Sequence, residues 1–264
     1  MKSSAFSVLL IGSLVLLVAF SPALALAGPI MAPGMRTGDV SSSSWYSTNW
    51  SGYAVTGSNV TSVQGSWIVP KVSGARYTTA YSSFWVGIDG FSSSTVEQIG
   101  TDSDVQRGRP VYYAWYEFYP SGMVQISSVA ISPGDVMFAN VTYLTGSTFR
   151  VSITDTTTGK SYSTTASVSN AARSSAEWIA EAPSSYFGVL PLANFGTINF
   201  GSDSTKVAAT CFATIGGATG NIGSFTSAVQ EITMVSRRNA VKALPSTLSS
   251  DGTSFSVTWE SAGP

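Results

Sequence analysis

Short stretches of alternating hydrophobic and polar residues fill the chain between Trp45 and Trp259. In Phe255–Trp259 the apolar residues share one face of a strand and the polar residues the other. Similar β-rich stretches are separated by Gly, Ser, Asn, Asp and Pro, and they lie at 62–69, 111–119, 136–144, 149–154, 176–181 and 254–259. Many short strands of this kind predict an all-β fold, a sandwich or a barrel.

Local signals refine this prediction. The run at 149–160 ends in an Asp/Gly turn, which predicts a hairpin with the following residues 161–165. Only 167–175 tolerates a helix, and it runs directly into a strand pattern, so no amphipathic helix longer than two turns is expected. No linker or repeat divides the chain, which predicts one β-sandwich domain over residues 45–264.

The N-terminus has the pattern of a secretory signal. Lys2 precedes an apolar stretch at 5–20 and a small-residue site ending at Ala27, so residues 1–27 are expected to be removed. A retained membrane anchor is the alternative, because the apolar run is only slightly short for a span. Residues 28–44 are expected to be a flexible leader or short propeptide. The chain is therefore expected to be secreted into the extracellular space, without stable membrane insertion after signal removal.

Composition excludes several classes of chemistry. Only 10% of the residues are charged, the formal net charge is −1 and no basic stripe is present, so nucleic acid is not an expected partner. With 13 Lys and Arg and no His, little positive charge accumulates at low pH, which favours acid tolerance. The lack of His removes the Ser-His-Asp triad, the Cys-His dyad and His-based zinc sites. Cys211, the only cysteine, cannot form an internal disulfide and is expected to be a small buried apolar residue. No metal or cofactor is expected, and the protein is expected to be a monomer.

Two aromatic-rich segments place carboxyl groups among large apolar side chains. In a strand over 112–119, Glu117 shares a face with Tyr113, Trp115 and Tyr119. In the strand over 176–181, Glu177 and Glu181 share a face. Burial among rings raises the pKa of a carboxyl group, as catalysis often requires. The pattern does not choose between these glutamates, and it also fits edge-strand residues facing water.

An amide lies in a third segment. Asp89 stands between Gly87 and Gly90, which predicts that a strand ends there and turns. Gln98 then lies in a new strand, on the face opposite to Glu97. A buried carboxamide is costly unless it has partners, and its NH2 group can donate a hydrogen bond to an oxyanion at any pH.

Seven blocks in order carry a family resemblance over about residues 45–262. They lie at 49–53, 65–70, 85–90, 98–100, 114–120, 176–181 and 254–259. Together these blocks resemble the glutamic peptidases, the eqolisin family.

The resemblance implies a fold, an activity and a site. The fold is a sandwich of two packed antiparallel sheets, similar to the concanavalin-like lectins. The activity is that of an acid endopeptidase acting on proteins or peptides, pepstatin-insensitive and metal-independent. The catalytic pair is Gln98 and Glu181, with Glu177 as the fallback. Positions expected to bind substrate or support the site are Trp50, Trp85, Asp89, Glu117 and Tyr113.

The chain departs from the fungal members of the family at two points. They carry an acid at the position of Tyr113, so the supporting network is expected to differ here, and they often have disulfides. In the implied mechanism Glu181 is ionised in the free enzyme and takes a proton from water, while Gln98 stabilises the oxyanion.

Other function classes are compatible with the fold. A carbohydrate-active sandwich, a glycosidase or a lectin-like module, could use Glu117 and Glu181 as a carboxyl pair if these lay about 5 Å apart. A non-catalytic surface domain is a third possibility.

Overall fold

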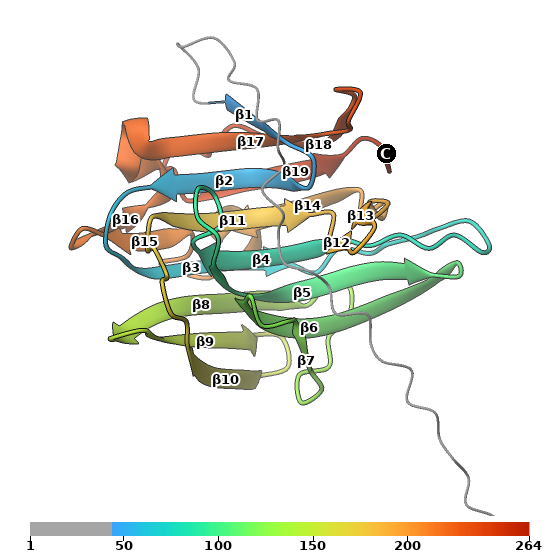
Figure 1. Ribbon diagram of the computed structural model, residues 1–264. Coiled ribbons are helices and arrows are strands. Elements are labelled where there is room, and N and C mark those ends of the chain that lie inside the picture. Colours follow the sequence, from blue (N-terminus) through green and yellow to red (C-terminus); the bar gives the residue numbers. More distant parts are fainter. Residues whose placement is uncertain (1–43, 264) are drawn as a thin grey trace, which may run out of the picture.

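A computed structural model describes residues 44–263, and almost all of its regular structure is β-strand (Figure 1). This confirms the predicted all-β class. The predicted signal peptide at 1–27 and nearly all of the predicted leader at 28–44 lie outside the described residues. In the part of the chain that is described, no helix is long and apolar enough to cross a membrane.

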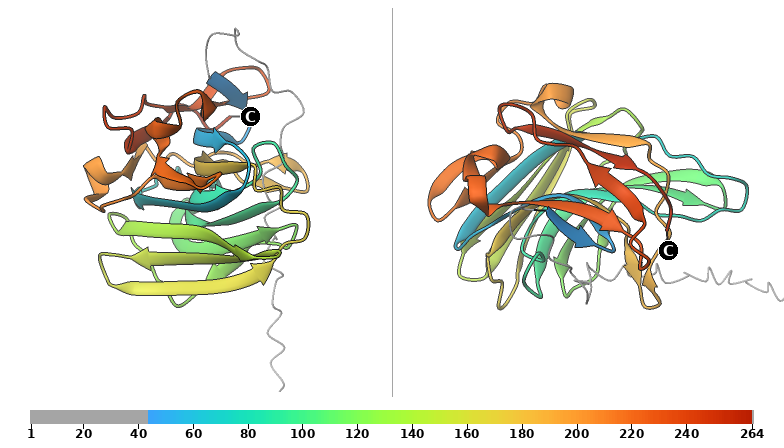
Figure 2. Two further views of the ribbon diagram at one scale, coloured as in Figure 1. Left: turned by 90° about the vertical axis from the view of Figure 1, so that its left-hand side faces the viewer. Right: turned by 90° about the horizontal axis from the view of Figure 1, so that it is seen from above.

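The strands form two packed layers, which Figure 2 shows from the side and from above. Neighbouring strands of the first layer are β7-β6-β5-β4-β11-β2-β17-β1, all antiparallel except the parallel β1–β17 pair. Their bounds are β1 Ser44–Ser47, β2 Trp50–Thr56, β4 Ser83–Ile88, β5 Val96–Gln106, β6 Arg109–Tyr119, β7 Val124–Ile126, β11 Ser175–Glu181 and β17 Val229–Val235.

The second layer runs from β10 through β9 and β8 to β3, and from there to β15 and β14. Next come β19 and β18, and β18 pairs with β17 of the first layer, so the two layers are joined along one edge. The bounds are β3 Val60–Ile68, β8 Val136–Thr145, β9 Thr148–Asp155, β10 Lys160–Ser167, β14 Thr197–Gly201, β15 Phe212–Ile215, β16 Ala218–Asn221, β18 Val241–Pro245 and β19 Ser254–Trp259. A separate small hairpin pairs β12 (Ser184–Ser185) with β13 (Gly188–Val189).

Apolar side chains fill the space between the layers. Among the largest that are fully buried are Trp67, Trp178 and Phe149. A second, smaller cluster covers the outer face of the first layer and is built around Trp85 and Trp115. The alternation in β6 divides between the two, because Ala114 and Phe118 pack in the main core while Trp115 lies on the outer face, as predicted.

Several local predictions can be compared with the structure. The predicted hairpin is present, since β9 pairs antiparallel with β10. Residues 168–174 are turns and irregular chain rather than helix. No pattern predicted α1 (Ser202–Thr205) or the 3-10 segment Ile222–Ala228. The 3-10 segment is broken at Thr226, whose φ and ψ are not helical, so no uninterrupted helix within residues 44–263 is longer than two turns. Cys211 is fully buried, and burial raises the pKa of its thiol to about 12.

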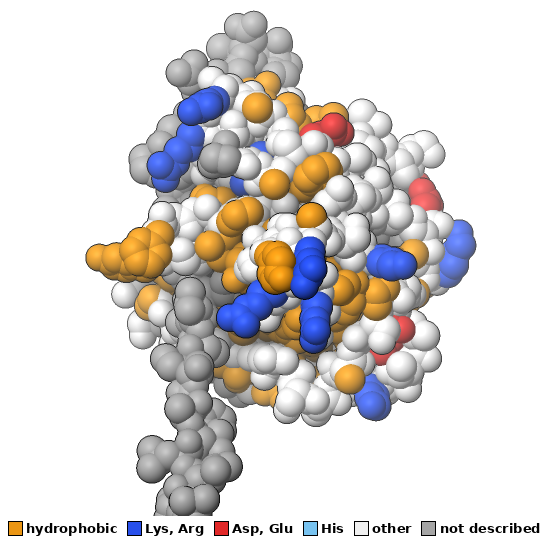
Figure 3. Space-filling model, turned by 90° about the vertical axis from the view of Figure 1, so that its right-hand side faces the viewer, with side chains coloured by type: hydrophobic (Ala, Val, Ile, Leu, Met, Phe, Trp, Pro, Cys, Tyr) orange, Lys and Arg blue, Asp and Glu red, His pale blue; other side chains and the backbone are white. Residues whose placement is uncertain are grey.

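The surface matches the low charge of the sequence. Figure 3 shows one face, on which Lys and Arg side chains, several of them gathered near its centre, and few Asp or Glu are set among uncharged polar groups and apolar patches. A surface of this kind loses few ion pairs when its carboxylates become protonated.

Candidate active site

The candidate residues lie on the outer face of the first layer, in two rows that cross its central strands. One row joins Glu181, Ser83, Asp102 and Tyr113 through directly paired positions of β11, β4, β5 and β6. Directly paired residues of antiparallel strands point to the same side of a sheet. The fold therefore places these four side chains on one face.

The second row crosses β11 four residues before Glu181, at Glu177. It joins Glu177, Gly87, Gln98 and Glu117 in the same order of strands. Since four residues is an even number, this row shares the face of the first. The structure thus brings both predicted catalytic residues, and the fallback Glu177, to one side of the sheet.

Glu181 is the last residue of β11 and only 5% of its side chain is exposed. The indole Nε1 of Trp85 donates to its Oε2 at 2.9 Å, and Asn49 Nδ2 donates to its Oε1 at 3.3 Å. Burial raises the pKa of Glu181 to about 8, the charge of Glu117 raises it as well, and the two donors act in the opposite direction. Trp50 packs edge-on against Trp85, with ring centroids 4.9 Å apart, and closes the site from β2.

Gln98 lies directly opposite Glu117 on the neighbouring strand. Its Nε2 donates to Glu117 Oε2 at 2.5 Å, and both side chains are nearly fully buried. Burial raises the pKa of Glu117 to about 8, which the hydrogen bond from Gln98 partly offsets. The remaining oxygens, Gln98 Oε1 and Glu117 Oε1, are buried without a hydrogen-bond partner among the described residues. Buried polar atoms of this kind are expected at sites that bind water or substrate.

Two buried aspartates, Asp102 and Asp104, form a hydrogen-bond network on the same face of the sheet. Ser83 Oγ donates to Asp102 Oδ1 at 2.5 Å, and the Tyr113 hydroxyl donates to Asp102 Oδ2 at 2.7 Å and to Asp104 Oδ2 at 3.2 Å. Both aspartates are fully buried, and burial raises the pKa of each. Tyr113 therefore supports this network as a hydrogen-bond donor.

Sequence reasoning did not single out these two aspartates, nor Asn49 as a partner of Glu181. A signal was available, because Gln98, Asp102 and Asp104 recur at a period of two in β5 and so share one face.

Two glycines pack closely against Trp85. A Cβ atom at Gly87 would lie 2.8 Å from Trp85 Cζ3, on the indole ring. One at Gly100 would lie 2.3 Å from the Phe84 carbonyl oxygen and 2.5 Å from Trp85 Cβ. These distances are too short for any real side chain, so the position of Trp85, whose indole N–H donates to Glu181, requires glycine at both places.

Glu177 and Asp89 belong to different surroundings. The charges that act on Glu177 are those of Asp89 and Glu97, whereas Glu117 and Asp102 act on Glu181. The carboxylate of Asp89 accepts hydrogen bonds from the backbone N–H groups of Arg173 and Ser174, at 2.7 and 2.8 Å. Asp89 therefore holds the loop that enters β11, and it makes no hydrogen bond to the Gln98 or Glu181 side chain.

The family of the chain follows from comparison with known proteins. A family model described as the peptidase A4 family matches residues 48–244. The chain belongs to the peptidase A4 family, the eqolisins or glutamic peptidases. Aspergillopepsin-2 of Aspergillus niger is 32% identical to it over 59% of this chain and 63% of that protein. Scytalidopepsin B of Scytalidium lignicola is 35% identical over 51% of each chain. The chain thus spans about half to two thirds of the length of these curated relatives.

Solved structures of eqolisins have the same fold. Scytalido-glutamic peptidase with a transition state analog inhibitor superimposes with a TM-score of 0.67 at 26% identity, covering 81% of this chain and 98% of that chain. Aspergilloglutamic peptidase from Aspergillus niger gives a TM-score of 0.57 at 28% identity, covering 69% and 99%. The sandwich implied by the resemblance is therefore confirmed.

Within residues 44–263, no group of three or more His, Cys, Asp or Glu side chains is arranged to hold a metal ion.

Proposed function

We propose that this eqolisin is a secreted acid endopeptidase in which Glu181 is the general base and Gln98 stabilises the oxyanion. The observation that carries the proposal is that two buried side chains lie on the same face of the sheet. One is the carboxyl group of Glu181, which accepts hydrogen bonds from two donors, and the other is the carboxamide of Gln98. Membership of a peptidase family and its likeness to a peptidase with a transition state analog inhibitor support the choice of peptide substrates.

In this mechanism ionised Glu181 takes a proton from a water molecule, whose oxygen attacks the scissile carbonyl carbon. The Gln98 NH2 group donates to the resulting oxyanion, and Glu181 returns the proton to the leaving amine as the C–N bond breaks. The products are a carboxylic acid and an amine, and the enzyme is regenerated. In the structure Gln98 Nε2 donates to Glu117, so Glu117 would hold the amide in position until substrate binds.

The pKa of Glu181 modifies the mechanism expected from the sequence. Because burial raises this pKa to about 8, Glu181 is protonated rather than ionised in the resting enzyme at acid pH. A base with this pKa would be most active near or above pH 8, so activity at acid pH requires that the pKa of Glu181 falls when substrate and water bind, in the direction in which the hydrogen bonds from Trp85 and Asn49 already act. These two residues are therefore proposed to set the pH range of activity.

Digestion of casein at acid pH by purified protein tests the proposal. Wild-type activity should resist pepstatin and a metal chelator, and Gln98→Ala and Glu181→Gln should each abolish turnover while the folded β-sheet signal in circular dichroism persists. Glu260→Gln, at an exposed glutamate, is the matched control and should retain activity. Turnover by Glu181→Gln would overturn the assignment of the base.

The carbohydrate-active alternative would need Glu117 and Glu181 as its working pair. The relatives named above are peptidases, and Glu117 is engaged by the Gln98 amide. Hydrolysis of polysaccharides, with no peptide cleavage, would restore this alternative. Secretion is tested by expressing the full chain and sequencing the N-terminus of the protein in the medium, which should begin after Ala27 if the predicted signal is cut.

A further inference from the structure

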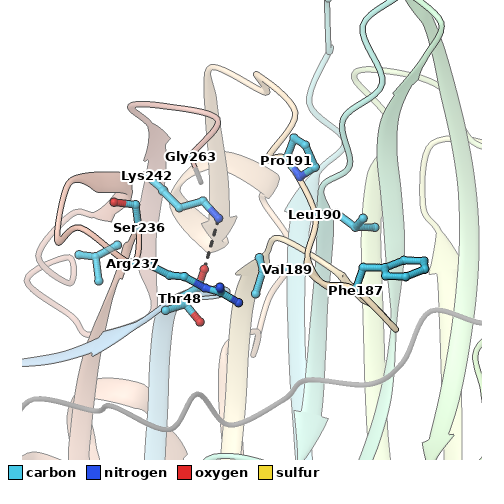
Figure 4. Close-up of a pocket in the computed structure, with 10 residues that line it drawn as sticks. Thr48, Phe187, Val189, Leu190, Pro191, Ser236, Arg237, Lys242 and Gly263 are labelled. Carbon is cyan, nitrogen blue, oxygen red and sulfur yellow. Dashed lines mark hydrogen bonds between the residues drawn. The ribbon is translucent and has the colours of Figure 1, made fainter.

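A cationic pocket lies just beyond the strand ends at which Glu181 is placed. It has a volume of about 330 Å3 (Figure 4). The residues that line it are Thr48, Phe187, Val189, Leu190, Pro191, Val235, Ser236, Arg237, Lys242 and Gly263. Lys242 and Arg237 enter from one side, and Phe187, Leu190 and Pro191 stand opposite. The lining residues thus combine two cations with an apolar wall and include no Asp or Glu.

The backbone connects this pocket directly to the candidate catalytic carboxyl. Thr48 precedes Asn49, whose side chain binds Glu181. On the other side of Glu181, the Ala182 N–H donates to the Asn49 carbonyl at 2.8 Å. The chain then continues into the small β12–β13 hairpin that forms the apolar wall. A peptide bound across Glu181 would therefore extend past this pocket.

Lys242 is the unusual group in the pocket. Only 2% of the residue is exposed, and the one hydrogen bond that its ammonium makes within residues 44–263 is to the Thr48 carbonyl, at 3.3 Å. An ammonium group has three N–H donors, and a buried charge without an anion is costly. Burial lowers its pKa to about 8, so the group is still charged at acid pH.

Arg237 brings a second charge to the same space. It lies in the turn after β17, is exposed, and its guanidinium would be 3.5 Å from a Cβ atom at Gly188 in the hairpin opposite. The pocket therefore has one positive charge inside it, from Lys242, and a second at its rim, from Arg237. A carboxylate would accept from the Lys242 donors that no residue within 44–263 engages and would pair with Arg237, while its carbon stem would contact the apolar wall.

We infer that this pocket is a substrate subsite that recognises a carboxylate of the bound peptide, at a fixed distance from the cleaved bond. The inference rests on the proposed peptidase function and adds a specificity determinant to it. The carboxylate could belong to an Asp or Glu side chain or to the C-terminus of the peptide. Both sources present the same chemistry to Lys242 and Arg237.

The test uses a neutral fluorogenic peptide in which a single Glu is moved along the sequence on both sides of the cleaved bond. Each Glu peptide is compared with its Gln counterpart, and a second pair has a free or an amidated C-terminus. At one position the carboxylate should raise kcat/KM by about 10- to 100-fold, the effect of a charge-assisted hydrogen bond. The advantage should disappear as the pH falls below the pKa of the peptide carboxyl, about 4.3 for Glu.

Variants assign the effect to the pocket. Arg237→Gln and Lys242→Met should each reduce the Glu-to-Gln ratio of kcat/KM towards one, whereas the neighbouring exposed Arg238→Gln should preserve it. If Lys242→Met does not fold, Arg237→Gln decides, because its side chain is exposed. An equal loss in Arg238→Gln, or a ratio that persists in both pocket variants, would overturn the inference.

The outcomes separate the two proposals. Cleavage of neutral peptides with no preference for a carboxylate at any position refutes the subsite but not the peptidase. If no peptide is cleaved, the proposed function fails, and the subsite is then judged by fluorescence anisotropy with the same labelled peptides. Equal binding of the carboxylate and amide peptides would refute it.

Discussion

Removing the indole N–H that binds Glu181 should move the pH dependence of activity. Trp85→Phe keeps an aromatic ring but deletes the donor that lies 2.9 Å from Glu181 Oε2. This hydrogen bond favours the ionised carboxylate and opposes the effect of burial, so its loss raises the pKa of Glu181 further. A hydrogen bond to a charged group contributes about 1.5–3 kcal/mol. At about 1.4 kcal/mol per pKa unit, this corresponds to about 1–2 units.

The assay is the pH profile of kcat on a neutral peptide, which reports the pKa of the base in the enzyme–substrate complex. Because the ionised form of Glu181 is the proposed base, activity rises as the pH passes upward through its pKa in that complex. The midpoint of this acid limb should therefore move about 1–2 units to higher pH in Trp85→Phe. Trp67→Phe is the matched control, since its indole N–H donates to the Thr101 hydroxyl and not to a carboxylate. An unchanged midpoint, or one moved to lower pH, in a folded Trp85→Phe protein would refute the role given to Glu181.

Three further predictions concern buried groups in the same layer. Burial raises the pKa of Glu97 from 4.5 to about 9, so the folded state binds the proton more tightly and stability falls as the pH rises, by about 3 kcal/mol from pH 4.5 to 7. Glu97→Gln should remove most of that slope in urea unfolding series, and a slope equal to that of the wild type would contradict the assignment. Tyr113→Phe deprives Asp102 of a donor and should cost about 1–3 kcal/mol in the same measurement, and no change would show that the hydroxyl is dispensable. Gly52→Ala places a Cβ atom 2.3 Å from the Trp178 carbonyl oxygen at a φ of +138°, and should cost about 3 kcal/mol or more, visible as a lowered Tm. A Tm equal to that of the wild type would mean that β2 can shift away from β11.

The alternation of residues predicted which face of a strand each side chain occupies. It could not predict which strands pair, and therefore which side chains of different strands lie side by side. The division of β6 into a core face and an outer face follows from the period of a strand, and the structure confirms it for Ala114 and Trp115. Glu177 and Glu181 share a face for the same reason, so alternation cannot separate them. Their different neighbours depend on the pairing of β11 with β4 and of β4 with β5, which is a tertiary property.

The cationic pocket could not be found in the sequence for a related reason. Its walls come from Thr48, from 187–191, from 235–242 and from Gly263, which are far apart along the chain. Lys242 follows Val241 in the strand VKALP, and nothing in that sequence indicates that the lysine is buried. Only the packing of these four segments gives the lysine its environment.

The fit of Trp85 against Gly87 and Gly100 has a consequence for how such a chain can diverge. A Cβ atom at Gly87 would meet the indole ring, and one at Gly100 would meet the Phe84 carbonyl oxygen and Trp85 Cβ, so a side chain at either glycine requires Trp85 or its strand to shift. The residues at positions 85, 87 and 100 are therefore expected to change together rather than one at a time. In an alignment of descendants of this sequence, we expect the three positions to be retained or lost together, whereas the exposed residues of the neighbouring turns vary independently.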